Sequence, residues 1–63
     1  MENHFQLGDN VVIYDHKENV PLDFGVLMNI KGEGIVEIDS SYTRQTEHYR
    51  LGDGVLMEKP KHV

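Results

Sequence analysis

The sequence predicts a small all-β domain, and three observations indicate this fold class. The chain of 63 residues contains no Ala, the strongest helix former, whereas Val, Ile and Thr together supply 13 residues. Its apolar residues form short groups separated by Gly, Asp and Asn, which is typical of strands joined by turns. No stretch long enough for a helix has the apolar spacing of an amphipathic helix.

The first predicted strand is Val11–Tyr14, which follows a turn-forming run of Gly, Asp and Asn. Successive side chains of a strand point to opposite faces, so Val11 and Ile13 share one face. Val12 and Tyr14 share the other. We expect the first of these faces to be buried.

A long polar connection, Asp15 to Asp23, separates this strand from the next. Pro21 within it favours an extended conformation for Val20. Long loops on small scaffolds often bind ligands. The segment is therefore either a connector that folds over one end of the domain or a binding loop.

A β-hairpin is predicted next. Its strands are 24–30 and 35–39, and Val36 and Ile38 share a face of the second. The connection, 31–34, contains two glycines, which supply the positive φ angles that tight hairpin turns require.

The rest of the chain is predicted to add two strands. A polar stretch, 40–46, is either a loop or the start of a strand over 47–51, in which apolar and polar residues alternate. A Gly-Asp-Gly turn then leads to a last strand, 55–58. We place the domain at residues 5–59, with flexible ends at 1–4 and 60–63.

Two segments of the sequence resemble each other, Leu7–Ile13 and Leu51–Met57, with four of seven positions identical. The match is too short for a duplicated unit, since repeats usually cover 20 residues or more. Both segments consist of a turn followed by a strand. If the first and last strands pair to close a barrel, the two turns would lie near its ends.

A family resemblance follows from the glycine-led strand motifs. These are Gly8-Asp9-x-Val11-x-Ile13, Gly25-Val26, Gly34-x-Val36-x-Ile38 and the closing Val55-x-Met57. Over residues 7–58 the pattern resembles a small SH3-like β-barrel, and within that group it is most similar to the KOW and Tudor-like branch. The resemblance implies a five-stranded SH3-like barrel. It does not imply a ligand, because the chain has neither the Trp of a peptide-binding SH3 domain nor the basic charge of a KOW module.

Composition and charge exclude several classes of protein. Without Cys, the chain cannot form disulfides, a zinc ribbon or a cysteine nucleophile. Eleven acidic against six basic residues give a net charge of −5, which disfavours direct nucleic-acid binding. No apolar run approaches the length of a membrane span, and no signal peptide is visible, so we expect a cytoplasmic protein.

No catalytic, metal or cofactor site is predicted. The four His residues lie 12, 32 and 14 positions apart, unlike the closely spaced ligands of structural zinc sites. Ser40 and Ser41 lie in a polar stretch without the sequence context of an activated nucleophile. We therefore expect no enzyme activity, no metal and no cofactor.

The predicted function is that of a non-enzymatic protein-interaction module. Tyr is enriched at interfaces, and aromatic clusters bind cations and peptides, whereas Phe24 is expected in the core. An acidic module favours a partner with a basic surface, and phage-encoded modulators of host enzymes include chains of this size and charge. A homodimer would supplement the small core. The alternative is a KOW- or Tudor-like accessory module that acts on nucleic acid within a larger complex. The candidate partner-binding residues are Tyr14, His16, Leu22, Tyr42 and Tyr49.

Overall fold

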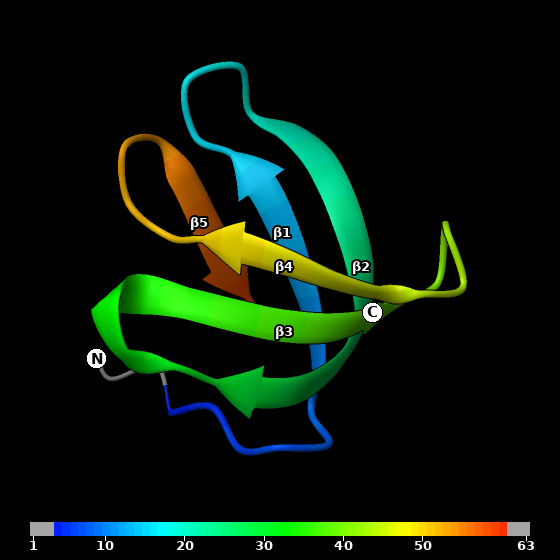
Figure 1. Ribbon diagram of the computed structural model, residues 1–63. Coiled ribbons are helices and arrows are strands. Elements are labelled where there is room, and N and C mark those ends of the chain that lie inside the picture. The colour runs from blue at the N-terminus through cyan, green and yellow to red at the C-terminus, as the bar shows by residue number, and fades with distance from the viewer. Residues whose placement is uncertain (1–3, 61–63) are drawn as a thin grey trace.

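Five strands form one antiparallel sheet in the computed structural model, which describes residues 4–60 (Figure 1). Within this range the only helical segment is a three-residue 3-10 turn, η1, and no helix is long and apolar enough to cross a membrane. The all-β prediction is therefore confirmed. The elements are β1 (Asn10–Asp15), β2 (Val20–Ile30), η1 (Gly32–Gly34), β3 (Ile35–Ser40), β4 (Thr46–Arg50) and β5 (Val55–Glu58).

The strand order across the sheet is β4-β3-β2-β1-β5. The strands β1 and β5 pair antiparallel, from Val12 opposite Glu58 to Asp15 opposite Val55, which is the pairing that the repeated turn-and-strand pattern left open. Because this pairing is antiparallel, the two similar turns lie at opposite ends of the ladder. No ladder within residues 4–60 joins β4 to β5, so the sheet is not closed into a barrel.

Strand β2 links the two halves of the sheet and bends strongly as it does so (Figure 1). Its first part pairs with β1 and its second part with β3. The register shifts once in each ladder, at Leu22 and at Met28. Such bulges bend a strand and increase its twist. Both bulge residues are exposed, at 44% and 50%.

The core is small and comes from the alternating inner positions of four strands. Val11 and Ile13 of β1 are buried as expected, and Val36 and Ile38, which alternation placed on one face of β3, are buried with them. Phe5, Tyr49, Leu51 and Val55 pack against this core from its margin. The fully packed cluster is Val11, Ile13, Leu27, Val36, Ile38 and Met57.

The prediction of a long connection from Asp15 to Asp23 is wrong. Strand β1 continues to Asp15 and β2 begins at Val20, directly opposite it, so only 16–19 form the turn. Asn19 closes this turn with a φ of 58°. Residues 20–22 at the start of β2 are exposed and include Pro21, a residue typical of turns, so together with the polar turn before them they resembled one long loop.

The prediction that Phe24 belongs to the core is also wrong, because its side chain is 42% exposed. The inner positions of this part of β2 are Asp23, Gly25 and Leu27, so alternation directs Phe24 outward. Gly25 is required there, since a Cβ atom would collide with the backbone carbonyl of Asp39 on β3.

The hairpin predicted between β2 and β3 is confirmed, but of its two glycines only Gly34 has a positive φ, and Glu33 has the other. Glu33 and Gly34 have φ angles of 64° and 77°, and the amide of Lys31 donates to the carbonyl of Ile35 at 2.8 Å. The polar stretch after β3 is mainly a turn, 41–45. The predicted flexible ends, 1–4 and 60–63, lie outside the described residues apart from His4 and Pro60.

Candidate functional site: the outer face of β1, β2 and β5

Apolar and aromatic side chains lie on the side of β1, β2 and β5 that points away from the core. We call this surface the outer face. The register places Tyr14 of β1 between Leu56 of β5 and Pro21 of β2. The outer face consists of Val12, Tyr14, Pro21, Phe24, Leu56 and Glu58.

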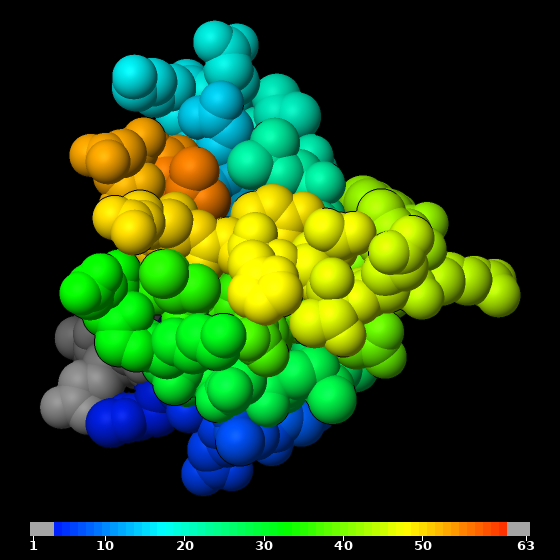
Figure 2. Space-filling view, viewed as in Figure 1, coloured from blue at the N-terminus to red at the C-terminus, as the bar shows by residue number. Residues whose placement is uncertain are grey.

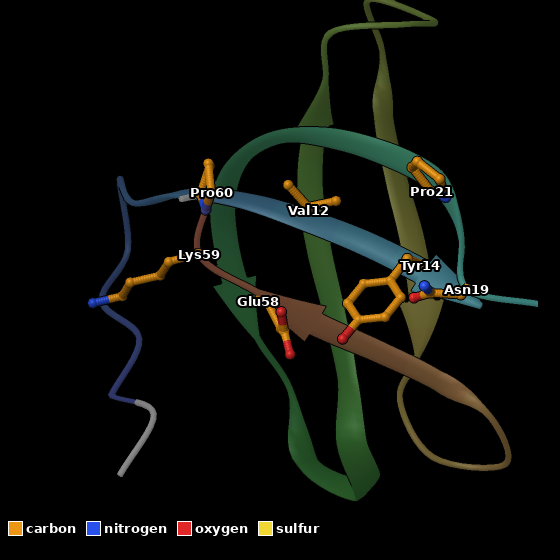
Figure 3. Close-up of a pocket in the computed structure, with 7 residues that line it drawn as sticks. All are labelled: Val12, Tyr14, Asn19, Pro21, Glu58, Lys59 and Pro60. Carbon is orange, nitrogen blue, oxygen red and sulfur yellow. The ribbon is translucent and has the colours of Figure 1, made fainter. Parts of the chain in front are cut away.

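Two adjoining grooves cross the outer face, with volumes of about 470 and 430 Å³. They share three lining residues, Val12, Lys59 and Pro60, so the two grooves lie next to each other along β1. The first groove is lined by Val12, Tyr14, Asn19, Pro21, Glu58, Lys59 and Pro60 (Figure 3). The second is lined by Asp9, Asn10, Val12, Phe24, Lys59 and Pro60.

At one wall of the first groove, the Tyr14 hydroxyl points toward the Glu58 carboxylate (Figure 3). This proximity raises the pKa of Tyr14, chiefly because the hydroxyl proton can hydrogen-bond to that carboxylate, with smaller effects from desolvation and charge repulsion. The wall therefore presents an aromatic ring and a negative charge together.

An exposed aromatic pair borders the second groove. The rings of Phe24 on β2 and Tyr42 in the β3–β4 turn meet edge to face, with centroids 5.0 Å apart and an angle of 86°. Tyr42 is 59% exposed. Because each ring holds the other in place, the pair offers a preorganised apolar contact surface.

Lys59 fixes the edge shared by the two grooves. Its Nζ lies 3.5 Å from Asp9 Oδ2 and 5.9 Å from the centre of the Phe5 ring. The same Asp9 oxygen accepts a hydrogen bond from the amide of Gln6 at 2.9 Å. These contacts hold the N-terminal segment against the residues that follow β5.

A polar cluster lies on the opposite, inner side of the sheet around Asp23, which is only 1% exposed. The hydroxyls of Ser40 and Tyr49 donate to its two carboxylate oxygens, each at 2.6 Å, and the amide of Phe24 donates at 2.7 Å. Burial, followed by this hydrogen bond to Asp23, raises the pKa of Tyr49 to about 12. The cluster joins β2, β3 and β4. Because it is buried, we interpret it as stabilising the fold and not as a binding site.

A second charged cluster lies on the surface of β3 and β4. The Glu37 carboxylate contacts Lys31 Nζ at 2.7 Å and His48 Nε2 at 3.0 Å. The hydrogen bond from Lys31 is the largest effect that lowers the pKa of Glu37. Since Glu37 pairs with the Lys31 ammonium and also contacts the His48 ring, its charge is compensated within the cluster.

The predicted partner-binding residues do not form one cluster. Tyr14 lies on the outer face, and Tyr42 borders it through Phe24, whereas Leu22 is the bulge residue of β2. His16 lies in the β1–β2 turn, where its amide donates to Gly54 at 2.6 Å and joins the two turns seen side by side in Figure 2 (cyan and orange).

Tyr49 does not belong to this surface, because it packs against the core and its hydroxyl donates to the buried Asp23. Sequence reasoning missed Phe24, Pro21 and Glu58 as parts of the outer face. Alternation directs Phe24 outward once Asp23, Gly25 and Leu27 are known to face inward, and the sequence alone does not show this.

No group of three or more His, Asp or Glu residues within residues 4–60 is arranged to hold a metal ion. Comparison with protein-family models, with curated proteins and with solved structures finds no match to this chain. The candidate site is therefore argued from its own geometry.

Proposed function

We propose that this chain is a non-enzymatic protein-interaction module that binds a partner protein through the outer face of β1, β2 and β5. The observation that carries the proposal is the exposed Phe24–Tyr42 pair beside two joined grooves. Contiguous exposed apolar surface often marks an interface, and aromatic residues are enriched there.

The charge of the chain supports a partner with a basic surface. The net charge is −5, and both grooves include an acidic residue, Glu58 in one and Asp9 in the other. Complementary charge steers the encounter of two proteins and selects among partners. The same charge repels the phosphates of nucleic acid, and no described feature favours that alternative.

We further infer that the sheet is an SH3-like barrel left open between β4 and β5. The strand order supports this inference, as does the bent β2, which pairs with β1 at one end and with β3 at the other. In this arrangement the unpaired edges of the sheet are those of β4 and β5, and the outer face of β1, β2 and β5 lies on the outside of the barrel.

The proposal is tested by capturing proteins from an extract of source cells on the immobilised chain, with and without nuclease. Mass spectrometry then identifies what is retained. We expect a protein that survives nuclease treatment and is lost with the Phe24→Ser/Tyr42→Ser double variant. The matched control is Met28→Ser/Ile30→Ser, which removes two equally exposed apolar residues at the other end of β2 and should retain the partner.

Two outcomes would overturn the proposal. Capture that disappears with nuclease would favour the nucleic-acid module. Capture that is equal for the wild type and the Phe24/Tyr42 variant would show that the outer face is not the interface. Chemical denaturation of each variant verifies that it is folded.

A further inference from the structure

We propose that Tyr14 and Glu58 form a subsite for the guanidinium or ammonium group of an Arg or Lys side chain on the partner. This inference rests on the proposed function and specifies the chemistry of its partner. Tyr14 comes from β1 and Glu58 from β5, and both line the first groove (Figure 3). Their side chains combine an aromatic ring with a carboxylate, and each attracts a cation.

The charge of Glu58 is not compensated within the described part of the chain. Among residues 4–60, no Lys, Arg or His lies within ion-pair distance of its carboxylate. Glu37, by contrast, pairs with Lys31, and Asp9 pairs with Lys59. Lys59 follows Glu58 in sequence but extends away from Tyr14 (Figure 3). The groove is therefore left with a negative charge at its wall.

The remaining walls of the groove fit the rest of a long cationic side chain. Val12 and Pro21 are apolar and can contact the methylene groups of Lys or Arg, which pack well on such surfaces. Asn19 lies at the turn end of the groove, where its side-chain oxygen offers a further acceptor. A phosphate or carboxylate would instead meet the Glu58 charge, so the same geometry disfavours an acidic occupant.

The first experiment uses blocked arginine, Nα-acetyl-arginine N-methylamide, as the probe in an NMR titration of the isotope-labelled chain. The equivalent blocked citrulline is the matched control probe, because it has nearly the same shape but no charge. We expect saturable shifts of the Tyr14, Asn19 and Glu58 amides with arginine and none with citrulline. Equal shifts with both probes, or no shift at these amides, would overturn the subsite.

The second experiment repeats the titration with Glu58→Gln. This variant removes the charge, and we expect binding about threefold to fivefold weaker, the size of one exposed ion pair. Glu33→Gln makes the same change in the exposed η1 turn, outside both grooves, and should bind like the wild type. Equally weakened binding of the arginine probe by both variants would mean that only the net charge of the chain matters, and this would contradict the proposed subsite.

The proposal of the subsite and the proposal of the interaction module can be contradicted independently of each other. If Glu58→Gln captures the cellular partner as strongly as the wild type does, while Phe24→Ser/Tyr42→Ser loses it, the subsite is wrong and the module stands. If Glu58→Gln weakens capture and Glu33→Gln does not, the subsite is supported on the natural partner as well as on the probe.

Discussion

Tyr49 and Tyr14 each direct a hydroxyl toward a carboxylate, yet one pair is enclosed and the other borders an open groove. Tyr49 donates to the buried Asp23, whose other oxygen is occupied by Ser40. Tyr14 lies beside Glu58 on the outer face, where solvent reaches both groups (Figure 3). Each pair consists of a tyrosine and a carboxylate, and the two pairs differ mainly in how deeply they are buried.

The difference in burial gives the two pairs different expected roles, one in the stability of the fold and the other in binding. A buried acceptor that loses its donors is costly, because water cannot replace them. A carboxylate at the surface loses little when its neighbour is removed, and it remains free to meet a ligand. We therefore expect the Asp23 pair to control folding and the Glu58 pair to control binding.

The largest expected difference between the two pairs is in the stability lost when the carboxylate of each pair is removed. Asp23→Ala leaves the Ser40 and Tyr49 hydroxyls without their acceptor and should lower the free energy of unfolding by about 3 kcal/mol. Glu58→Ala is the matched change on the outer face and should leave the urea midpoint unchanged. Comparable losses of stability in the two variants would remove the distinction between the pairs.

A smaller effect is expected from removing each hydroxyl. Tyr49→Phe keeps the ring but leaves one oxygen of Asp23 unsatisfied, so we expect a loss of about 1–2 kcal/mol in urea denaturation. Tyr14→Phe should have the same midpoint as the wild type, because the groove is open to water. A midpoint of Tyr49→Phe equal to that of the wild type would contradict the structural role of the Asp23 cluster.

For the Asp23 cluster and for the outer face, the sequence predicted the strands better than it predicted the polar contacts between them. Alternation and glycine-rich turns are local patterns, and they located β1, β3 and the turn between β2 and β3. The burial of Asp23 depends on Ser40 and Tyr49, which lie 17 and 26 residues away. Nothing near Asp23 in the sequence indicates these partners.

The outer face was only partly predictable for a related reason. Tyr14 could be assigned to it from alternation in β1 alone. Phe24 could not be placed without knowing that Asp23 faces inward, and Glu58 joins Tyr14 only through the pairing of β1 with β5. The bulge at Leu22 also shifts the register between β1 and β2, and no residue in the sequence indicates that a bulge occurs there.

The smallest expected effect concerns high pH. Burial and Asp23 raise the pKa of Tyr49 to about 12 in the folded chain, from the ordinary value of 10.0. The folded state therefore retains this proton more tightly than the unfolded state does. The resulting stability is complete below pH 10 and is lost as the pH rises from 10 through about 12.

Urea midpoints measured over this pH range would detect the loss, with Tyr49→Phe as the control that lacks the titrating group. We expect the wild type to lose stability more steeply than the variant between pH 10 and 12. Parallel declines in the two proteins would show that Tyr49 does not contribute to the pH dependence.

The pairing of β1 with β5 has a consequence for the order in which the chain is made. Val12 lies opposite Glu58, so this ladder forms only after β2, β3 and β4, which separate its two strands in the sequence, have been synthesised. A nascent chain that has completed β1 to β4 still exposes one edge of β1. Unpaired strand edges attract other chains, so the growing polypeptide is most exposed to aggregation just before β5 becomes available.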